Sequence, residues 1–96
     1  MIEHLVWFKL KPEVTSEQTR DLLEGLRALP AQIPGILHLA CGEDFSGRSQ
    51  GYQVGLVVRF ESREALANYG PHPAHETFIA TFRPLWESVM ALDFEG

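Results

Sequence analysis

The sequence predicts a single α+β domain with the element order β-α-β-β-α-β. Four strand-like segments with apolar alternation are separated by two regions in which apolar residues recur at helical spacing. A chain of 96 residues is too short to divide into separate cores. Apolar residues make up 45% of it and charged residues 22%, as in a packed globular domain, so neither disorder nor a membrane protein is expected.

The first strand and helix are indicated by residues 2 to 29. Apolar side chains fall on both parities from residue 2 to residue 10, which is typical of a strand buried on both faces for most of its length. Thr15 and Gln18 resemble a capping box that begins a helix at residues 16 to 29. Its apolar stripe consists of Leu22, Leu23, Leu26 and Leu29.

A hairpin is predicted next, because residues 36–44 and 52–60 both read as strands and a polar, glycine-containing loop joins them. Ser62 then caps a short helix at residues 63–69, which ends at Gly70-Pro71. Pro73 restarts the helix at its first turn, where a missing N–H costs nothing. The apolar stripe of this second segment consists of Phe78, Ile79, Phe82 and Trp86, and Pro84 is expected to kink or end it near residue 83.

A last strand from about Val89 to Phe94 completes a ferredoxin-like fold, in which helices cover one face of a four-stranded antiparallel sheet. The uncovered face of such a sheet is normally polar. Here several strands stay apolar on both parities, at Leu5, Trp7, Leu37, Leu39, Val57 and Val58. A second copy of the same sheet is the simplest cover, so we expect a homodimer.

Composition and charge exclude several classes of function. Eight Lys and Arg against thirteen Asp and Glu give a net charge of −5, which is the wrong sign for a nucleic-acid binder. No apolar run approaches the roughly 20 residues that span a bilayer, and no leader is recognisable, so no membrane partner is expected. Cys41 is the only cysteine, and we expect a cytoplasmic protein in which it is a small core residue.

Three segments together resemble the stress-responsive A/B barrel (Dabb) family: His4–Lys11, Gly51-Tyr52 before a long apolar strand, and Tyr69–His75 with Leu92-Asp93-Phe94. The resemblance covers essentially the whole chain. It implies a dimeric α/β barrel, in which two sheets pack face to face across a two-fold axis. It leaves function open, because the family includes stress-response proteins as well as a plant polyketide cyclase.

In that cyclase, a tyrosine before a His-Pro-Ala-His motif and the second histidine of the motif form the active pair for an aldol-type ring closure. Tyr69 and His75 occupy those positions here. Gly70-Pro71 replaces bulkier apolar residues of the cyclase loop, so its substrate is not carried over.

The spacing alone also directs this pair inward. His75 precedes Phe78 and Phe82 by three and seven residues, which places it on the apolar face of its helix, and Tyr69 shares a face with Leu66. A neutral imidazole can remove a proton next to a carbonyl near pH 7 while a phenol hydrogen-bonds the enolate oxygen. The alternative is that both side chains fill space and bond to the backbone.

Other polar residues carry weaker signals. His4 either lines the same cavity or is a core histidine that holds the first strand, and the expected substrate-binding residues are His4, Phe78, Phe82 and Trp86. His38 and His72 are expected in an edge strand and a loop. No metal or cofactor is expected, because no carboxylate or thiolate stands at ligand spacing from His72 and His75. The G-x-S-x-G pattern at residues 47–51 matches a nucleophile elbow, but it links two strands and not a strand and a helix, so the match is a coincidence. Arg48 in this loop is expected either to be solvated or to bind an anionic ligand.

Three functions remain open. The first is an enzyme, a lyase, cyclase or isomerase that acts next to a carbonyl with His75 as base and Tyr69 as hydrogen-bond donor. The second is a non-catalytic, stress-responsive binding or structural dimer. The third is a haem-degrading or quinone-forming monooxygenase, which rests on fold analogy alone. The first two differ in whether Tyr69 and His75 reach an open cavity or are sealed by Phe78, Phe82 and Trp86.

Overall fold

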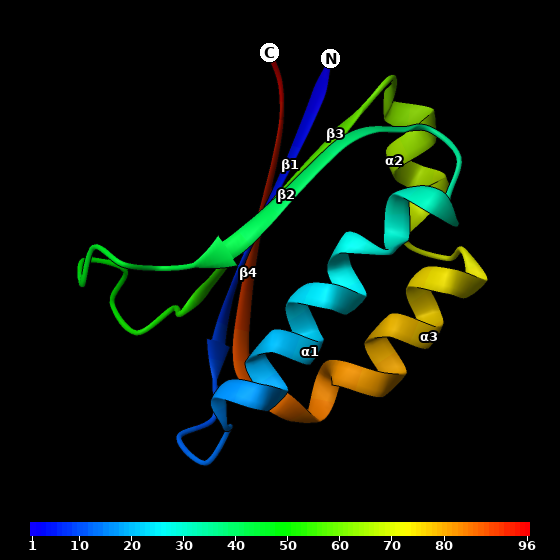
Figure 1. Cartoon of the computed structure of the whole chain (residues 1–96). Coiled ribbons are helices and arrows are strands. Elements are labelled where there is room, and N and C mark those ends of the chain that lie inside the picture. The colour runs from blue at the N-terminus through cyan, green and yellow to red at the C-terminus, as the bar shows by residue number, and fades with distance from the viewer.

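A computed structural model describes residues 1–96 and confirms the β-α-β-β-α-β order (Figure 1). The elements are β1 (Ile2–Leu10), α1 (Ser16–Arg27), β2 (Ile36–Glu43), β3 (Val54–Phe60), α2 (Arg63–Tyr69), α3 (Pro73–Phe82) and β4 (Trp86–Glu95). Two short 3-10 turns follow α1 and α3, at Leu29–Ala31 and Arg83–Leu85.

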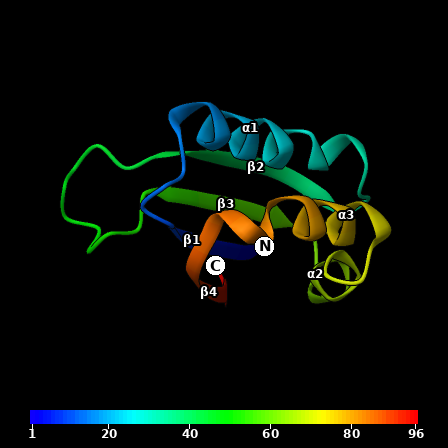
Figure 2. The same cartoon turned by 90° about the horizontal axis from the view of Figure 1, so that it is seen from below.

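The four strands form one antiparallel sheet in the order β2-β3-β1-β4. All three helices lie on one side of it (Figure 1), as predicted for a ferredoxin-like fold. Seen along the sheet, α1 lies beside β2, and the chain passes from α3 to β4 at the opposite edge (Figure 2). The first and last strands of the chain are therefore neighbours, and side chains about 90 residues apart in sequence share one face.

The start of α1 is fixed by the capping box that the sequence predicts. The hydroxyl of Thr15 accepts from the Gln18 amide at 3.1 Å, and the Gln18 side chain accepts from the Thr15 amide at 2.9 Å. The helix ends at Arg27, two residues before the predicted end, because a residue preceding proline disfavours the α conformation and Pro30 sits in the following 3-10 turn.

The core lies between the sheet and the helices. Seventeen apolar side chains form one cluster there, built from the helix-facing residues of the strands and the inward faces of the helices. The largest fully buried ones are Phe60, Leu22, Leu26, Leu29, Val54 and Val58. The buried faces are those that the hydrophobic periodicity predicts, so local pattern and tertiary packing agree.

The end of α3 differs from the expected stripe. Pro84 stops the helix at Phe82, and a 3-10 turn leads directly into β4, which begins at Trp86 rather than near Val89. Trp86 therefore does not belong to the α3 face. It pairs with Leu10 across the sheet and is 3% exposed, so its side chain belongs to the core beneath the helices.

The helix-free face of the sheet is apolar, as predicted, but with a different set of residues. A register shift between Ile36 and His38 in β2 brings Leu39 opposite Val58, and Val58 is fully buried in the core. The large apolar side chains that the helix-free face exposes are Trp7, Val57, Met90, Leu92 and Phe94. A single chain thus leaves one broad apolar surface uncovered.

Candidate functional site

Tyr69 and His75 are brought together by a break between two helices. Tyr69 is the last residue of α2, which the Ser62 hydroxyl caps by accepting from the Ala65 amide at 3.1 Å. After Gly70-Pro71, α3 begins at Pro73 with His72 as its cap, because the His72 Nδ1 accepts from the Ala74 amide at 3.0 Å. The expected loop histidine is therefore a helix cap, and it directs α3 so that His75 faces back toward α2.

The rings of Tyr69 and His75 touch, with centroids 4.4 Å apart and planes inclined by 53°. The His75 Nδ1 lies 3.0 Å from the Gly70 carbonyl oxygen. A carbonyl can only accept, so Nδ1 carries the proton in the neutral ring and Nε2 is left as the basic nitrogen. The break between the helices thereby fixes the tautomer of the candidate base.

His4 extends this pair from the sheet side. Its ring centroid is 5.8 Å from that of Tyr69, and Phe60 packs against both, at 6.2 and 5.0 Å. The His4 Nδ1 donates to the carboxylate of Asp93, its cross-strand partner on β4. A carboxylate, two imidazoles and a phenol thus lie in one row across the N- and C-terminal strands and the α2–α3 break.

Burial sets the protonation states of the pair. Desolvation raises the pKa of Tyr69 to about 12, so the phenol keeps its proton. The pKa of His75 is lowered, chiefly by desolvation and further by the charge on His4, although the Gly70 hydrogen bond and Glu76 oppose this. At neutral pH the pair therefore consists of a neutral imidazole and a protonated phenol.

The lowered pKa of His75 makes a prediction about stability. Because the fold favours neutral His75, its contribution is fully present above the ordinary value of 6.5 and is lost as pH falls from there through the lower folded pKa. We expect the free energy of unfolding, measured by urea denaturation between pH 7.5 and 5, to fall less steeply in His75→Gln than in the natural protein. His38→Gln, at an exposed position, should keep the natural slope. Parallel slopes for the natural protein and His75→Gln would contradict the prediction.

The pair is open to solvent toward the β4 edge. Tyr69 is 4% exposed, but His75 is half-buried, and the Asp93 side chain is 47% exposed. The helix-side residues of β4 from Val89 to Asp93 are also exposed, so the helices leave this part of the strand uncovered. A small molecule could therefore reach the row of polar groups from this side.

The other predicted binding residues lie elsewhere in the helix layer and core. Phe78 and Phe82 pack together with centroids 5.0 Å apart, and a Cβ on Gly25 of α1 would come within 2.6 Å of the Phe82 ring. The Trp86 ring lies 4.9 Å from Phe8. The ring pairs of these aromatic residues are with one another and with Phe8, and their binding role stays a prediction.

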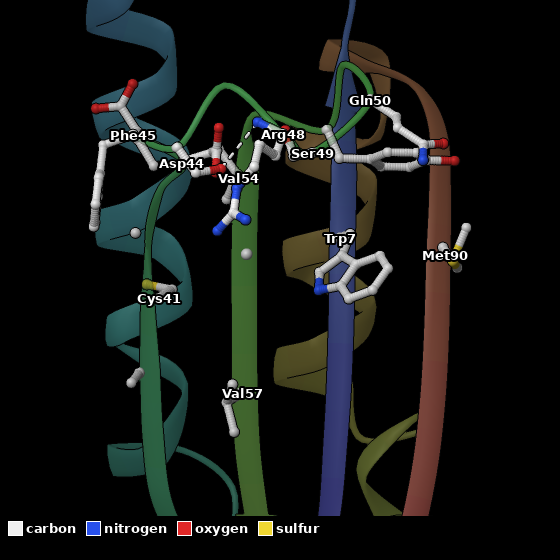
Figure 3. A pocket seen from close by; sticks show the side chains of 16 residues that line it. Trp7, Cys41, Asp44, Phe45, Arg48, Ser49, Gln50, Val54, Val57 and Met90 are labelled. Atoms are coloured by element: carbon white, nitrogen blue, oxygen red, sulfur yellow. Dashed lines mark hydrogen bonds between the residues drawn. The ribbon is translucent and has the colours of Figure 1, made fainter.

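Two hollows on the surface lie away from the pair. One, of about 880 Å³, is on the helix-free face beneath the β2–β3 loop (Figure 3). The other, of about 360 Å³, is a groove between α1 and α3 that Phe78 and Phe82 line. Neither is lined by Tyr69 or His75. A large cavity around the pair, as expected beneath the helices, thus stays a prediction.

Cys41 and the G-x-S-x-G segment offer no nucleophile. The thiol donates to the Leu23 carbonyl at 3.7 Å, and burial raises the pKa of Cys41 against the opposing effect of Arg27. Ser49 lies in the loop between β2 and β3 and not on a strand-to-helix turn. No group of three or more His, Cys, Asp or Glu side chains is placed to hold a metal ion, and no helix is long and apolar enough to cross a membrane.

Asp93 is the one member of the row that the sequence did not single out as functional. Its role depends on the pairing of β1 with β4, which puts it opposite His4. The signals in the sequence were its place in the last strand and in the Leu92-Asp93-Phe94 segment of the family resemblance. The cross-strand register was needed to connect it with His4.

Comparisons with family models, curated proteins and solved structures all point to one family and one fold. The model of a family described as the stress responsive A/B barrel domain matches residues 2–96. Olivetolic acid cyclase of Cannabis sativa is 30% identical over 95 residues, which span 97% of this chain and 94% of the cyclase. The crystal structure of At3g17210 from Arabidopsis thaliana has a TM-score of 0.91 at 30% identity, covering 100% of this chain and 95% of the other. A dimeric ferredoxin-like protein of unknown function from Thermobifida fusca has a TM-score of 0.88 at 26% identity, covering 99% and 90%.

Proposed function

Because the chain belongs to the stress responsive A/B barrel domain family, we propose that it works as a homodimer in which Tyr69 and His75 carry out acid–base chemistry next to a carbonyl group. The observation that carries this proposal is the contact between a protonated, buried phenol and a half-exposed imidazole with a free Nε2. Such a pair suits a cofactor-independent lyase, cyclase or isomerase.

In the proposed reaction, the Nε2 of His75 removes the proton from the carbon next to the carbonyl. The Tyr69 hydroxyl donates a hydrogen bond to the carbonyl oxygen, and this bond strengthens as the oxygen becomes an enolate. The resulting carbanion attacks an electrophilic carbon, expels a leaving group or is reprotonated elsewhere. These three outcomes correspond to a cyclase, a lyase and an isomerase.

His4 and Asp93 support the pair in this proposal. The Asp93 carboxylate fixes the orientation of the His4 ring by accepting a hydrogen bond from its Nδ1. The His4 ring then packs against the ring of Tyr69. With Phe60 packed against both rings, the phenol is confined between His4 and His75. This restricts the directions in which its hydroxyl can donate, as catalysis by orientation requires.

The similarity to olivetolic acid cyclase supports a reaction of this class, since Tyr69 and His75 stand where the family resemblance places its active pair. The substrate of this chain is a separate question. The half-exposed His75 and the exposed Asp93 side chain favour a carbonyl compound that enters from the β4 edge.

The homodimer is supported by the apolar helix-free face and by the Thermobifida relative, which is described as dimeric. Two sheets that pack face to face would form the barrel that the family name describes. A cytoplasmic location is part of the same proposal, supported by the single free thiol of Cys41.

Proton exchange tests the chemistry without knowledge of the natural substrate. Methyl ketones such as acetophenone are incubated with the protein in D₂O, and loss of the methyl signal is followed by NMR. We expect exchange above the rate of buffer alone at pH 7. The test is repeated with a panel of aryl and alkyl methyl ketones. If none of them exchanges faster with the natural protein than in buffer alone, the enzyme proposal is contradicted.

A non-catalytic binding dimer is the second candidate. The observation that favours it is the packing of Tyr69, which is 4% exposed and in contact with His4, Phe60 and His75. In that case the row of polar groups would serve stability alone. The proton-exchange experiment separates the two candidates, because only a catalytic pair accelerates exchange.

A further inference from the structure

The helix-free face of the sheet carries large apolar side chains on β1 and β4 but glycines at one corner on β2 and β3. Its cross-strand rows can be read from the register: one row contains Met90, Trp7, Gly55 and Gly42, and another contains Phe94 beside Glu3. The two glycines leave the β3 and β2 positions of the Trp7 row without side chains, and a Cβ on Gly42 would meet nothing within 4 Å. The hollow of about 880 Å³ lies over this glycine pair.

Figure 3 shows how the hollow is enclosed. Trp7 of β1 and Val57 of β3 rise at its sides, and Arg48 reaches over it from the β2–β3 loop. The loop is held by Asp44, whose carboxylate accepts from the Ser46 hydroxyl at 2.7 Å and from the Gly47 amide at 3.0 Å. The hollow is therefore a defined feature of the β2–β3 corner of the sheet.

The opposite corner carries two exposed apolar side chains. Phe94 and Leu92, near the end of β4, are 49% and 62% exposed on the same face. The strand order places β4 at the far edge from β2, and Phe94 pairs with Glu3 near the start of β1, whereas the hollow lies near its end. An exposed apolar corner and a hollow corner thus lie diagonally across one face.

The charged side chains do not distinguish the two corners. Glu43, Asp44 and Arg48 all line the hollow, and Lys9 lies over the Tyr52 ring, with Nζ 5.0 Å from its centroid. At the opposite corner, the Glu3 carboxylate binds Arg59 at 2.9 Å. Apolar exposure and the position of the hollow therefore decide which corners can meet.

A two-fold interface must be self-complementary, because each contact between residues i and j occurs again between j and i. We propose that, in the homodimer, Phe94 of each subunit fills the hollow over Gly42 and Gly55 of its partner, beside the partner's Trp7. The two-fold axis then lies in the interface, diagonal to the strands, and the two sheets cross at a steep angle, as in orthogonal sheet packing. This deepens the proposed function, on whose homodimer it rests. It also assigns the hollow over Gly42 and Gly55 to the dimer interface and not to the substrate.

A disulfide tests this contact. Positions 94 and 42 lie on strands that are separated by two others, about 14 Å apart at ordinary strand spacing, so no bond can form between them within one chain. In a Cys41→Ala background, the double variant Phe94→Cys/Gly42→Cys is oxidised and analysed on a non-reducing gel. We expect a covalent dimer from the double variant and none from either single variant. A covalent dimer from Phe94→Cys alone, or none from the double variant, would overturn the arrangement.

A second measurement keeps the proposal independent of oxidation. Analytical ultracentrifugation compares Phe94→Ala with Val89→Ala, a matched truncation on the opposite face of β4 at nearly the same exposure, 48% against 49%. We expect Phe94→Ala to raise the dimer dissociation constant about tenfold or more and Val89→Ala to leave it unchanged.

Gly42→Leu should weaken the dimer as Phe94→Ala does, because it fills the hollow without a clash inside the monomer. If Phe94→Ala and Gly42→Leu have the same dimer dissociation constant as the natural protein, the contact is overturned and the homodimer is not. A monomeric natural protein would overturn the homodimer and this contact with it.

Discussion

Replacement of His75 with Gln is expected to lower proton exchange at the carbon next to a ketone carbonyl by about 10²-fold or more. The amide can still donate to the Gly70 carbonyl, as the imidazole Nδ1 does, so the start of α3 should keep its geometry. It has no basic nitrogen in place of Nε2, and only a basic group can take the proton. The rates are measured by NMR in D₂O, with acetophenone as probe, at pH 7 and at several protein concentrations.

The control is His38→Gln, which makes the same substitution on the exposed edge strand β2 and should exchange at the natural rate. Tyr69→Phe complements it, because loss of the hydroxyl removes the donor to the enolate oxygen and leaves the ring packing in place. Circular dichroism confirms that each variant is folded. An unchanged exchange rate in folded His75→Gln would show that another group is the base.

Replacement of Phe60 with Ala is expected to lower the free energy of unfolding by about 3–5 kcal/mol, which includes the lost transfer free energy and the cavity left behind. Phe60 is the largest of the fully buried side chains, at 0% exposure, and its ring touches those of His4 and Tyr69. The variant should therefore also loosen the polar row, since the ring that confines the phenol is removed.

Phe45→Ala is the matched control, because it removes the same ring at a position that is fully exposed in the β2–β3 loop. It should change the free energy of unfolding by no more than about 0.5 kcal/mol. Urea denaturation gives both values, at one protein concentration for all proteins, because dimer dissociation makes stability depend on concentration. A loss from Phe60→Ala as small as that from Phe45→Ala would mean that the core can close around the missing ring.

If both predictions hold, they separate two roles that meet at Tyr69. Phe60 belongs to the packing that positions the phenol, whereas His75 belongs to the chemistry. The His75 effect should then appear in the exchange rate with little loss of folding stability at pH 7.5, and the Phe60 effect should appear chiefly in stability.

The sequence by itself determined the features that depend on neighbours close along the chain. The capping box of Thr15 and Gln18, the break at Gly70-Pro71 and the apolar stripes of the helices follow from local hydrogen bonding and from the 3.6-residue period. The period also directs Tyr69 and His75 inward, and the structure shows that their rings are in contact.

Only the tertiary structure decided what depends on cross-strand register. The pairing of β1 with β4 brings Asp93 to His4, and the shift in β2 packs the partly buried Leu39 against the core. Neither contact is visible in a periodic pattern. Likewise, Trp86 left the predicted helical stripe because Pro84 turned the chain into a strand. The position of the hollow depends on two glycines that lie side by side on different strands. A strand's alternation shows that it has two faces, but which residues meet across those faces is fixed by contacts between segments far apart in the chain.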